Sequence, residues 1–160
     1  MVEASSVGTI GILSECKNKW ERRCSLTPHE VKKITALGIR VLVQPSTNRC
    51  YSEDEFADAG ATIQEDVSEA SVIFGVKEVP IPDLLANKTY FFFSHTIKAQ
   101  EYNMTLLDTL LSLNIRMVDF EGIREPKADG KFPNRLVAFG RYAGVAGAFD
   151  FLRGIGEFLL

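Results

Sequence analysis

Short apolar runs, rich in β-branched and aromatic residues, recur along the chain and are typical of buried strands. They predict strands at 9–13, 40–44, 71–76, 89–93 and 115–118. Between them, apolar residues recur at helical spacing and predict helices at 27–37, 52–59 and 101–113. Two shorter segments give weaker patterns: 61–64 is a brief strand or a link, and 136–139 is a last short strand.

This alternation of strands and helices favours parallel pairing with right-handed crossovers. The predicted fold is therefore α/β, with an open, mostly parallel, doubly wound sheet of the Rossmann or flavodoxin type and helices on both faces. A long helix is expected at 141–160, with an apolar stripe that includes Tyr142, Val145 and Phe149. Its several glycines would suit close packing against a neighbouring backbone.

Two local signals refine this outline. Thr27-Pro28-His29-Glu30 predicts a helix start in which Thr27 caps the helix and Glu30 completes a capping box. The turn-rich polar segment 127–134 is expected to form a hairpin tip or an exposed loop.

Composition narrows the class of protein. The 160 residues suit one domain, and a net charge of −3 argues against nucleic-acid binding, which needs a basic face. No apolar run is long enough for a membrane span, and the first eight residues resemble neither a secretory signal nor a typical transit peptide. Three unpaired cysteines suit a reducing compartment such as the cytoplasm, and with only two histidines we expect no metal site.

Charged and polar side chains follow four of the predicted strands at the point where each strand ends. They are Glu15, Arg22 and Arg23 after the first, Lys77 and Glu78 after the third, Ser94, His95 and Lys98 after the fourth, and Asp119 and Glu121 after the fifth. Because open parallel sheets bind ligands beyond the carboxyl ends of their strands, we expect these side chains to form a converging site.

Each of these side chains has a structural and a functional interpretation. Lys77 is either a solvated strand end or an amine whose pKa is lowered by partial burial, so that it can take a proton near neutral pH. His95 is either a structural histidine or an acid–base group. Arg23 either pairs with Glu15 or Glu21 or binds a substrate carboxylate.

The same two interpretations apply later in the chain. Glu121 either begins a helix or holds a substrate ammonium group, and Arg135 lies between the polar loop and the last predicted strand. His29, in a first helical turn, is expected at the surface. Gly154-Ile155-Gly156 lies inside a predicted helix and lacks the third glycine, so we interpret it as packing and expect no dinucleotide site in this chain.

Six segments occur in the order seen in one family. They are KWERR at 19–23 with LTP at 26–28, GVK at 75–77, FFSHTIKAQ at 92–100, and VAFG at 137–140 with YAG at 142–144. The chain resembles, over nearly its whole length, the lysine–ketoglutarate reductase portion of the bifunctional α-aminoadipic semialdehyde synthases. It is more distantly similar to fungal saccharopine dehydrogenase and to the amino-terminal domain of alanine dehydrogenase and transhydrogenase.

That resemblance implies a reaction in which lysine and 2-oxoglutarate join through an imine that reduced NADP converts to saccharopine. It implies that Lys77 and His95 are the acid–base pair, and that Arg23 and Arg135 bind substrate carboxylates. Lys98 and Glu121 would help to place the substrates.

In the family a dinucleotide-binding domain follows the long helix. The resemblance therefore implies a substrate-binding domain at 1–140 and, at 141–160, a helix leading to a domain absent from this chain. This chain alone is expected to be inactive. An alanine dehydrogenase-like domain and a non-catalytic binding or regulatory module are the alternatives. A homo-oligomer, NAD in place of NADP, and a mitochondrial matrix location with the transit peptide absent stay open.

Overall fold

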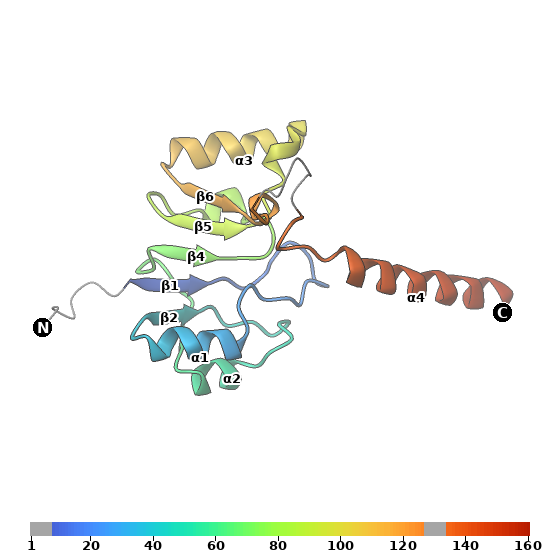
Figure 1. Cartoon of the computed structure of the whole chain (residues 1–160), viewed down its shortest axis with the longest axis horizontal. Helices are drawn as coiled ribbons and strands as arrows, with labels where there is room; N and C mark the ends of the chain where they lie inside the picture. Colours follow the sequence, from blue (N-terminus) through green and yellow to red (C-terminus); the bar gives the residue numbers. More distant parts are fainter. Residues whose placement is uncertain (1–7, 127–133) are drawn as a thin grey trace, which may run out of the picture. The chain divides into compact units, whose positions relative to one another are not determined.

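A six-stranded sheet organises the chain in the computed structural model, which describes residues 8–126 and 134–160. Its strands are β1 (Thr9–Ile12), β2 (Arg40–Val43), β3 (Thr62–Ile63), β4 (Val72–Phe74), β5 (Thr89–Phe92) and β6 (Arg116–Asp119). Their order is β3-β2-β1-β4-β5-β6, and every neighbouring pair is parallel (Figure 1). The predicted open parallel sheet is confirmed, and the segment 61–64 contains a strand.

The main helices lie within a residue or two of the predicted ranges. They are α1 (Pro28–Ala36), α2 (Glu53–Asp58), α3 (Glu101–Ser112) and α4 (Gly140–Leu159). Three short 3-10 turns, η1 (Ile81–Asp83), η2 (Thr96–Lys98) and η3 (Phe120–Gly122), follow strands or strand extensions.

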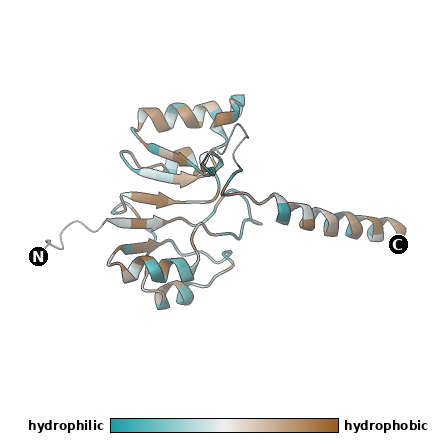
Figure 2. Cartoon of the chain, in the orientation of Figure 1, coloured by the Kyte–Doolittle hydropathy of each residue, from teal (hydrophilic) through white to brown (hydrophobic). Residues whose placement is uncertain are grey.

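Two hydrophobic cores lie against the sheet, because strand side chains alternate between its faces. The first joins strand residues to α1 and α2 and consists of Ile12, Val31, Val41, Val43, Phe56 and Ala59. The second joins strand residues to α3 and includes Ile73, Tyr90, Phe92, Leu106 and Leu110. Figure 2 shows the apolar character of the central strand β4. Both faces are therefore covered, as the doubly wound prediction requires.

Strand β1 packs unusually close to the segment that leads into β4. A Cβ atom added at Gly11 would lie 3.1 Å from Ala70 Cβ and 3.2 Å from Val67 Cβ. Glycine at this position therefore lets the crossover lie directly on the central strand.

Two local predictions were wrong. Thr27 is the N-cap of α1, but its side chain makes no capping hydrogen bond, and the box with Glu30 does not form. The helix nevertheless begins at Pro28, whose fixed φ suits the first helical position and which has no N–H that would need a partner. A complete capping box instead begins α2, between Ser52 and Glu55.

The predicted strand at 136–139 was also wrong. The described residues there hold a single antiparallel bridge, Arg124 with Arg135, because the chain passes directly from this bridge into α4. The predicted hairpin tip at 127–134 falls almost entirely outside the described residues.

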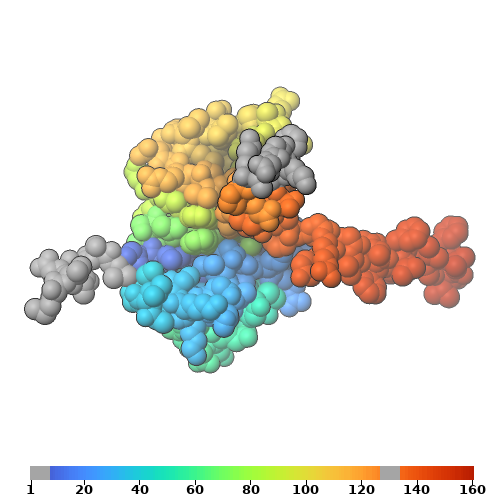
Figure 3. Space-filling model, viewed as in Figure 1, coloured from blue at the N-terminus to red at the C-terminus, as the bar shows by residue number. Residues whose placement is uncertain are grey.

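The chain divides into two compact units, Met1–Phe120 and Glu121–Leu160. The functional division expected after residue 140 is a separate matter and stays a prediction. In the second unit, α4 (red in Figure 3) has no buried residue, and its large apolar side chains are exposed. A Cβ atom built on its glycines meets no described atom within 4 Å beyond the helix's own backbone, and the close packing expected of these glycines stays a prediction.

No helix in the described part of the chain combines the length and the hydropathy that crossing a bilayer requires.

Candidate active site

The sheet order reverses between β1 and β4, and this is where open parallel sheets bind ligands. Glu15, just beyond β1, occupies this point. Its carboxylate accepts hydrogen bonds from the backbone N–H groups of Val76, at 2.6 Å, and Lys77, at 3.0 Å. Burial raises the pKa of Glu15, and the two amides oppose that rise. The glutamate thus fixes the backbone from which the Lys77 side chain projects.

A cavity of about 380 Å³ opens beside Lys77. Its apolar wall includes Leu13, Val79 and Tyr90. Its charged lining consists of Lys77 with the carboxylates Glu15, Glu65, Asp66, Glu78 and Asp83. A cavity of this size admits a small metabolite, and the excess of carboxylates favours one that carries an ammonium group.

His95 lies beyond β5, next to the end of β4, and Glu78 links the two strand ends. The His95 Nε2 atom is 3.9 Å from Glu78 Oε1, and its Nδ1 atom is 3.2 Å from Lys98 Nζ. Because an ammonium group only donates, Nδ1 accepts and Nε2 carries the proton that faces Glu78. Lys77, His95 and Lys98 are therefore gathered at one edge of the sheet, as the sequence predicted.

His95 also has an unusual backbone. Its φ of 56° and ψ of 8° place it in the left-handed region, which residues other than glycine seldom adopt. Neighbouring side chains form a hydrogen-bonded network around it. Buried Ser94 donates its hydroxyl to Asp119 Oδ2 at 2.5 Å, its N–H reaches the same oxygen at 3.2 Å, and Thr96 contacts its hydroxyl at 2.8 Å.

Arg23 pairs with Glu21. The guanidinium meets both carboxylate oxygens, with Nε 2.7 Å from Oε1 and Nη2 2.5 Å from Oε2. This charge-assisted fork lowers the pKa of Glu21 and raises that of Arg23. Pairing with Glu21, one of the two interpretations of Arg23, is thus confirmed, and carboxylate binding stays a prediction.

The loop that carries Arg23 is tied to the segment between β2 and α2. Asn48 donates its amide to the carbonyl groups of Lys19, at 3.0 Å, and Glu21, at 2.8 Å. The Cys50 N–H bonds to Arg22 O at 2.8 Å. These contacts hold the charged loop in one conformation.

Glu121 and Arg135, the remaining predicted site residues, both belong to the second unit. Arg135 Nη1 donates to Glu121 Oε1 at 3.0 Å, and Glu121 is buried. The guanidinium and the carboxylate thus already form an ion pair with each other.

Asn48, Glu65 and Asp66 were not among the predicted site residues. Glu65 and Asp66 lie just beyond β3, so the strand-end rule applied to the other strands would have found them. Asn48 gave no signal, because its role depends on a contact between two loops.

Among the described residues, the connection at the sheet reversal does not fit the pyrophosphate of a nicotinamide dinucleotide. The connection from β1 to α1 contains no glycine from Leu13 to Thr27, and Pro28 at the start of α1 has no N–H to offer a phosphate. Glu15 already takes the two amides at the sheet reversal. Burial also raises the pKa of Cys24 to about 12, so the thiol of this residue stays protonated at neutral pH.

The amino-acid sequence matches a known protein family. The family described as "Alanine dehydrogenase/PNT, N-terminal domain" matches residues 11–146. The mitochondrial α-aminoadipic semialdehyde synthase of Rattus norvegicus is 49% identical over 143 residues, which cover 89% of this chain and 15% of that protein. The saccharopine dehydrogenase [NAD(+), L-lysine-forming] of Yarrowia lipolytica is 32% identical over 133 residues, covering 80% of this chain and 35% of the fungal protein.

Solved structures agree on the fold. An L-alanine dehydrogenase superposes with a TM-score of 0.64 at 21% identity, covering 74% of this chain and 34% of that one. The chain therefore spans a minor part of each of these proteins, and at this identity the structural likeness concerns the fold.

Proposed function

We propose a function on the premise that this chain belongs to the alanine dehydrogenase/PNT N-terminal domain family. The chain is the substrate-binding part of an oxidoreductase that condenses L-lysine with 2-oxoglutarate and reduces the imine to saccharopine. The observation that carries this proposal is that Lys77, which lines the acidic cavity, and His95, which contacts Lys98, follow the neighbouring strands β4 and β5 at their carboxyl ends. The likeness to the semialdehyde synthase and saccharopine dehydrogenase supports the choice of substrates.

In this proposal Lys77 and His95 move the protons of imine formation. One group takes a proton from the ε-ammonium of lysine, so that the amine can attack the ketone carbon. The other gives a proton to the hydroxyl that leaves as water. Glu15 supports Lys77 by fixing its backbone. Lys98 sets the tautomer of His95.

Cations and carboxylates divide the substrates between them. The acidic cavity favours the amine substrate, and Arg23, Lys98 and Arg135 are the groups proposed for the carboxylates of 2-oxoglutarate. Glu121 is proposed to help place the amine. Because Arg23 and Arg135 are each paired with a glutamate, a substrate carboxylate must share or replace that partner.

The hydride donor is proposed to be NADP, bound by a domain outside this chain. The name of the rat relative includes "mitochondrial", and this supports the mitochondrial matrix over the cytoplasm as the proposed location.

The direct test uses a protein that joins this chain to a dinucleotide-binding domain. We expect Lys77→Met and His95→Gln to lower saccharopine formation by about 10²- to 10⁴-fold, the usual contribution of a general acid or base. Lys32→Met and His29→Gln are matched controls, because both residues are exposed on α1. Full activity in Lys77→Met and His95→Gln would overturn the site assignment.

This chain alone is expected to bind lysine without oxidising NADPH. Calorimetry with lysine and with 2-oxoglutarate measures the binding, and absorbance at the nicotinamide band measures the turnover. NADPH oxidation by these 160 residues with both substrates would contradict the proposal.

Alanine dehydrogenase-like activity is the second candidate, favoured by the family and by the structural likeness. Pyruvate with ammonium replaces 2-oxoglutarate with lysine in that reaction. Oxidation of the reduced nicotinamide with pyruvate and ammonium, and none with 2-oxoglutarate and lysine, would select this candidate.

A further inference from the structure

Strand β6 ends opposite the point where the chain turns into His95. The ladder between β5 and β6 finishes at Phe92 and Asp119. Past that pair, the Ser94 N–H donates to the Asp119 side chain, with N 3.2 Å from Oδ2. In a continuing strand pair, this N–H would instead donate to a backbone carbonyl group of the neighbouring strand. The carboxylate therefore ends the strand pairing and allows the chain to change direction.

The Ser94 hydroxyl extends this contact across His95. It donates to Asp119 Oδ2 at 2.5 Å, so its single proton is used, and the Thr96 hydroxyl at 2.8 Å must donate to it. The Thr96 N–H also reaches the Ser94 hydroxyl, at 3.2 Å. A chain of donors thus runs from Thr96 through Ser94 to Asp119 and encloses the backbone of His95.

This network explains how a strained conformation persists. Ser94 is fully buried, so releasing its hydroxyl from Asp119 would leave a buried polar group without a partner. That loss opposes relaxation of the left-handed φ of His95. The turn aims the imidazole along the sheet edge, with Nε2 3.9 Å from Glu78.

We propose that Asp119 is a positioning residue, which acts through Ser94 to hold His95 in the left-handed turn that presents its imidazole to Glu78. The effect on catalysis rests on the proposed acid–base role of His95. The effect on the position of the imidazole does not, and it can be measured in this chain without any reaction.

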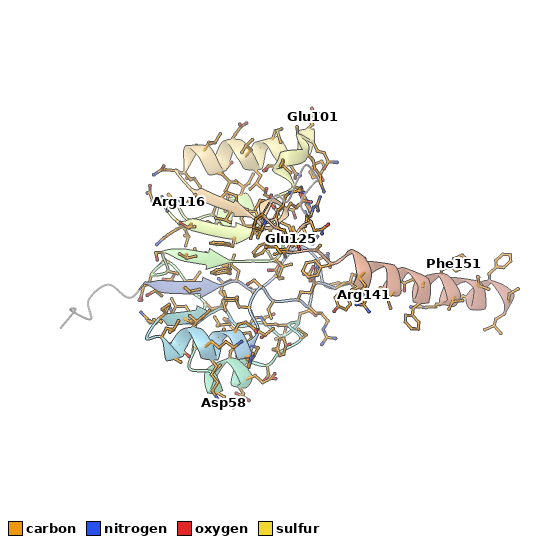
Figure 4. All side chains as sticks on the ribbon, in the orientation of Figure 1. Asp58, Glu101, Arg116, Glu125, Arg141 and Phe151 are labelled. Carbon is orange, nitrogen blue, oxygen red and sulfur yellow. The ribbon has the colours of Figure 1, made fainter. Side chains whose placement is uncertain are left out.

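The test follows the two histidines of the chain by NMR, with exposed His29 as the internal reference. We expect Asp119→Ala to shift the ring resonances of His95, while those of His29 stay unchanged. Asp58→Ala is the matched control, because it removes an exposed carboxylate on α2 (Figure 4) and should move neither histidine.

Two further variants separate positioning from general damage to the fold. Asp119→Asn should keep the wild-type His95 signals, because both Ser94 bonds go to one oxygen that an amide can supply. Ser94→Ala should shift them, and adding it to Asp119→Ala should produce little further change. If Asp119→Ala does not fold, Asp119→Asn and Ser94→Ala still test whether the hydrogen bonds of Ser94 position His95.

Unchanged His95 signals in folded Asp119→Ala, or in Ser94→Ala, would overturn the positioning role. In a reductase-competent protein, Asp119→Ala should lower kcat by about 10²-fold and change KM little. If the His95 signals move as expected but His95→Gln keeps full activity, the positioning role stands and the proposed function fails.

Discussion

At the scale of single residues, Arg23 and Glu21 give the clearest electrostatic prediction. Arg23 lowers the pKa of Glu21 by bonding to its charged form. A carboxylate whose pKa is lowered by folding stabilises the protein above its unfolded pKa, about 4.3, and loses that contribution as the pH falls through its folded pKa. The stabilisation from this pair is therefore present at neutral pH and lost in acid.

We expect Arg23→Ala to lower the free energy of unfolding at pH 7 by about 1 kcal/mol or less, because solvent screens the 42% exposed Arg23 side chain. Wild type and variant should converge toward pH 3. Urea denaturation at several pH values measures both curves, and Arg22→Ala in the same loop is the control. An equal difference at every pH would contradict the assignment to this ion pair.

Residue types and their order along the chain were enough to predict the gathering of Lys77, His95 and Lys98. Each follows an apolar strand, and parallel strands carry their carboxyl ends to one edge. The left-handed turn at His95 could not be predicted in this way. It depends on Asp119, which lies on a neighbouring strand, and the modest enrichment of histidine at positive φ is too weak to specify that conformation.

At the scale of elements, the two helix starts provide a matched pair. Ser52 caps α2 with a real side-chain bond, and Thr27 stands at the cap of α1 without one. We expect Ser52→Ala to destabilise the fold by about 1 kcal/mol. Thr27→Ala should cost clearly less. Chemical denaturation compares the two, and equal losses would contradict the role of the Ser52 bond.

Strand β1 provides a second prediction at this scale. A side chain at Gly11 would collide with Val67 and Ala70, which belong to the crossover into β4. We expect Gly11→Val to destabilise the fold by about 1–3 kcal/mol through overpacking. Gly8→Ala is the control, because its nearest neighbour beyond the adjacent residues would be Ser71 Oγ at 3.5 Å, an ordinary contact. Unchanged stability of Gly11→Val in denaturation would show that the crossover can move aside.

Element boundaries followed well from periodicity where a strand or helix is buried on one side. The short segment at 136–139 shows the limit of that method. Its apolar residues suggested a strand, yet a strand needs a partner to pair with, and only the bridge of Arg124 with Arg135 forms there. Pairing partners are a tertiary property, and a local apolar run does not specify them.

At the scale of the whole molecule, α4 is the distinguishing feature of the second unit. Three of its phenylalanine side chains, Phe149, Phe151 and Phe158, are at least 68% exposed, and Figure 4 shows Phe151 projecting from the helix. Exposed apolar surface of this kind promotes association. We expect this chain to self-associate as its concentration rises, as sedimentation velocity would show.

The matched variants test the source of that association. Phe151→Glu should weaken it, whereas Leu37→Glu, at an isolated and 74% exposed position after α1, should not. Equal behaviour of both variants would assign the association to a surface other than α4.

The reversal of sheet order at β1 also has a consequence for biosynthesis. Ile10 pairs with Val41 on one side and with Val72 on the other. As the chain leaves the ribosome, β1, β2 and β3 can assemble first, but the second edge of β1 must wait for β4. At roughly 5–20 residues per second, the stretch from Ile63 to Phe74 takes about a second to emerge. For that interval β1, one of the two central strands of the finished sheet, has an open edge. The nascent chain is therefore most exposed to wrong strand pairing at β1.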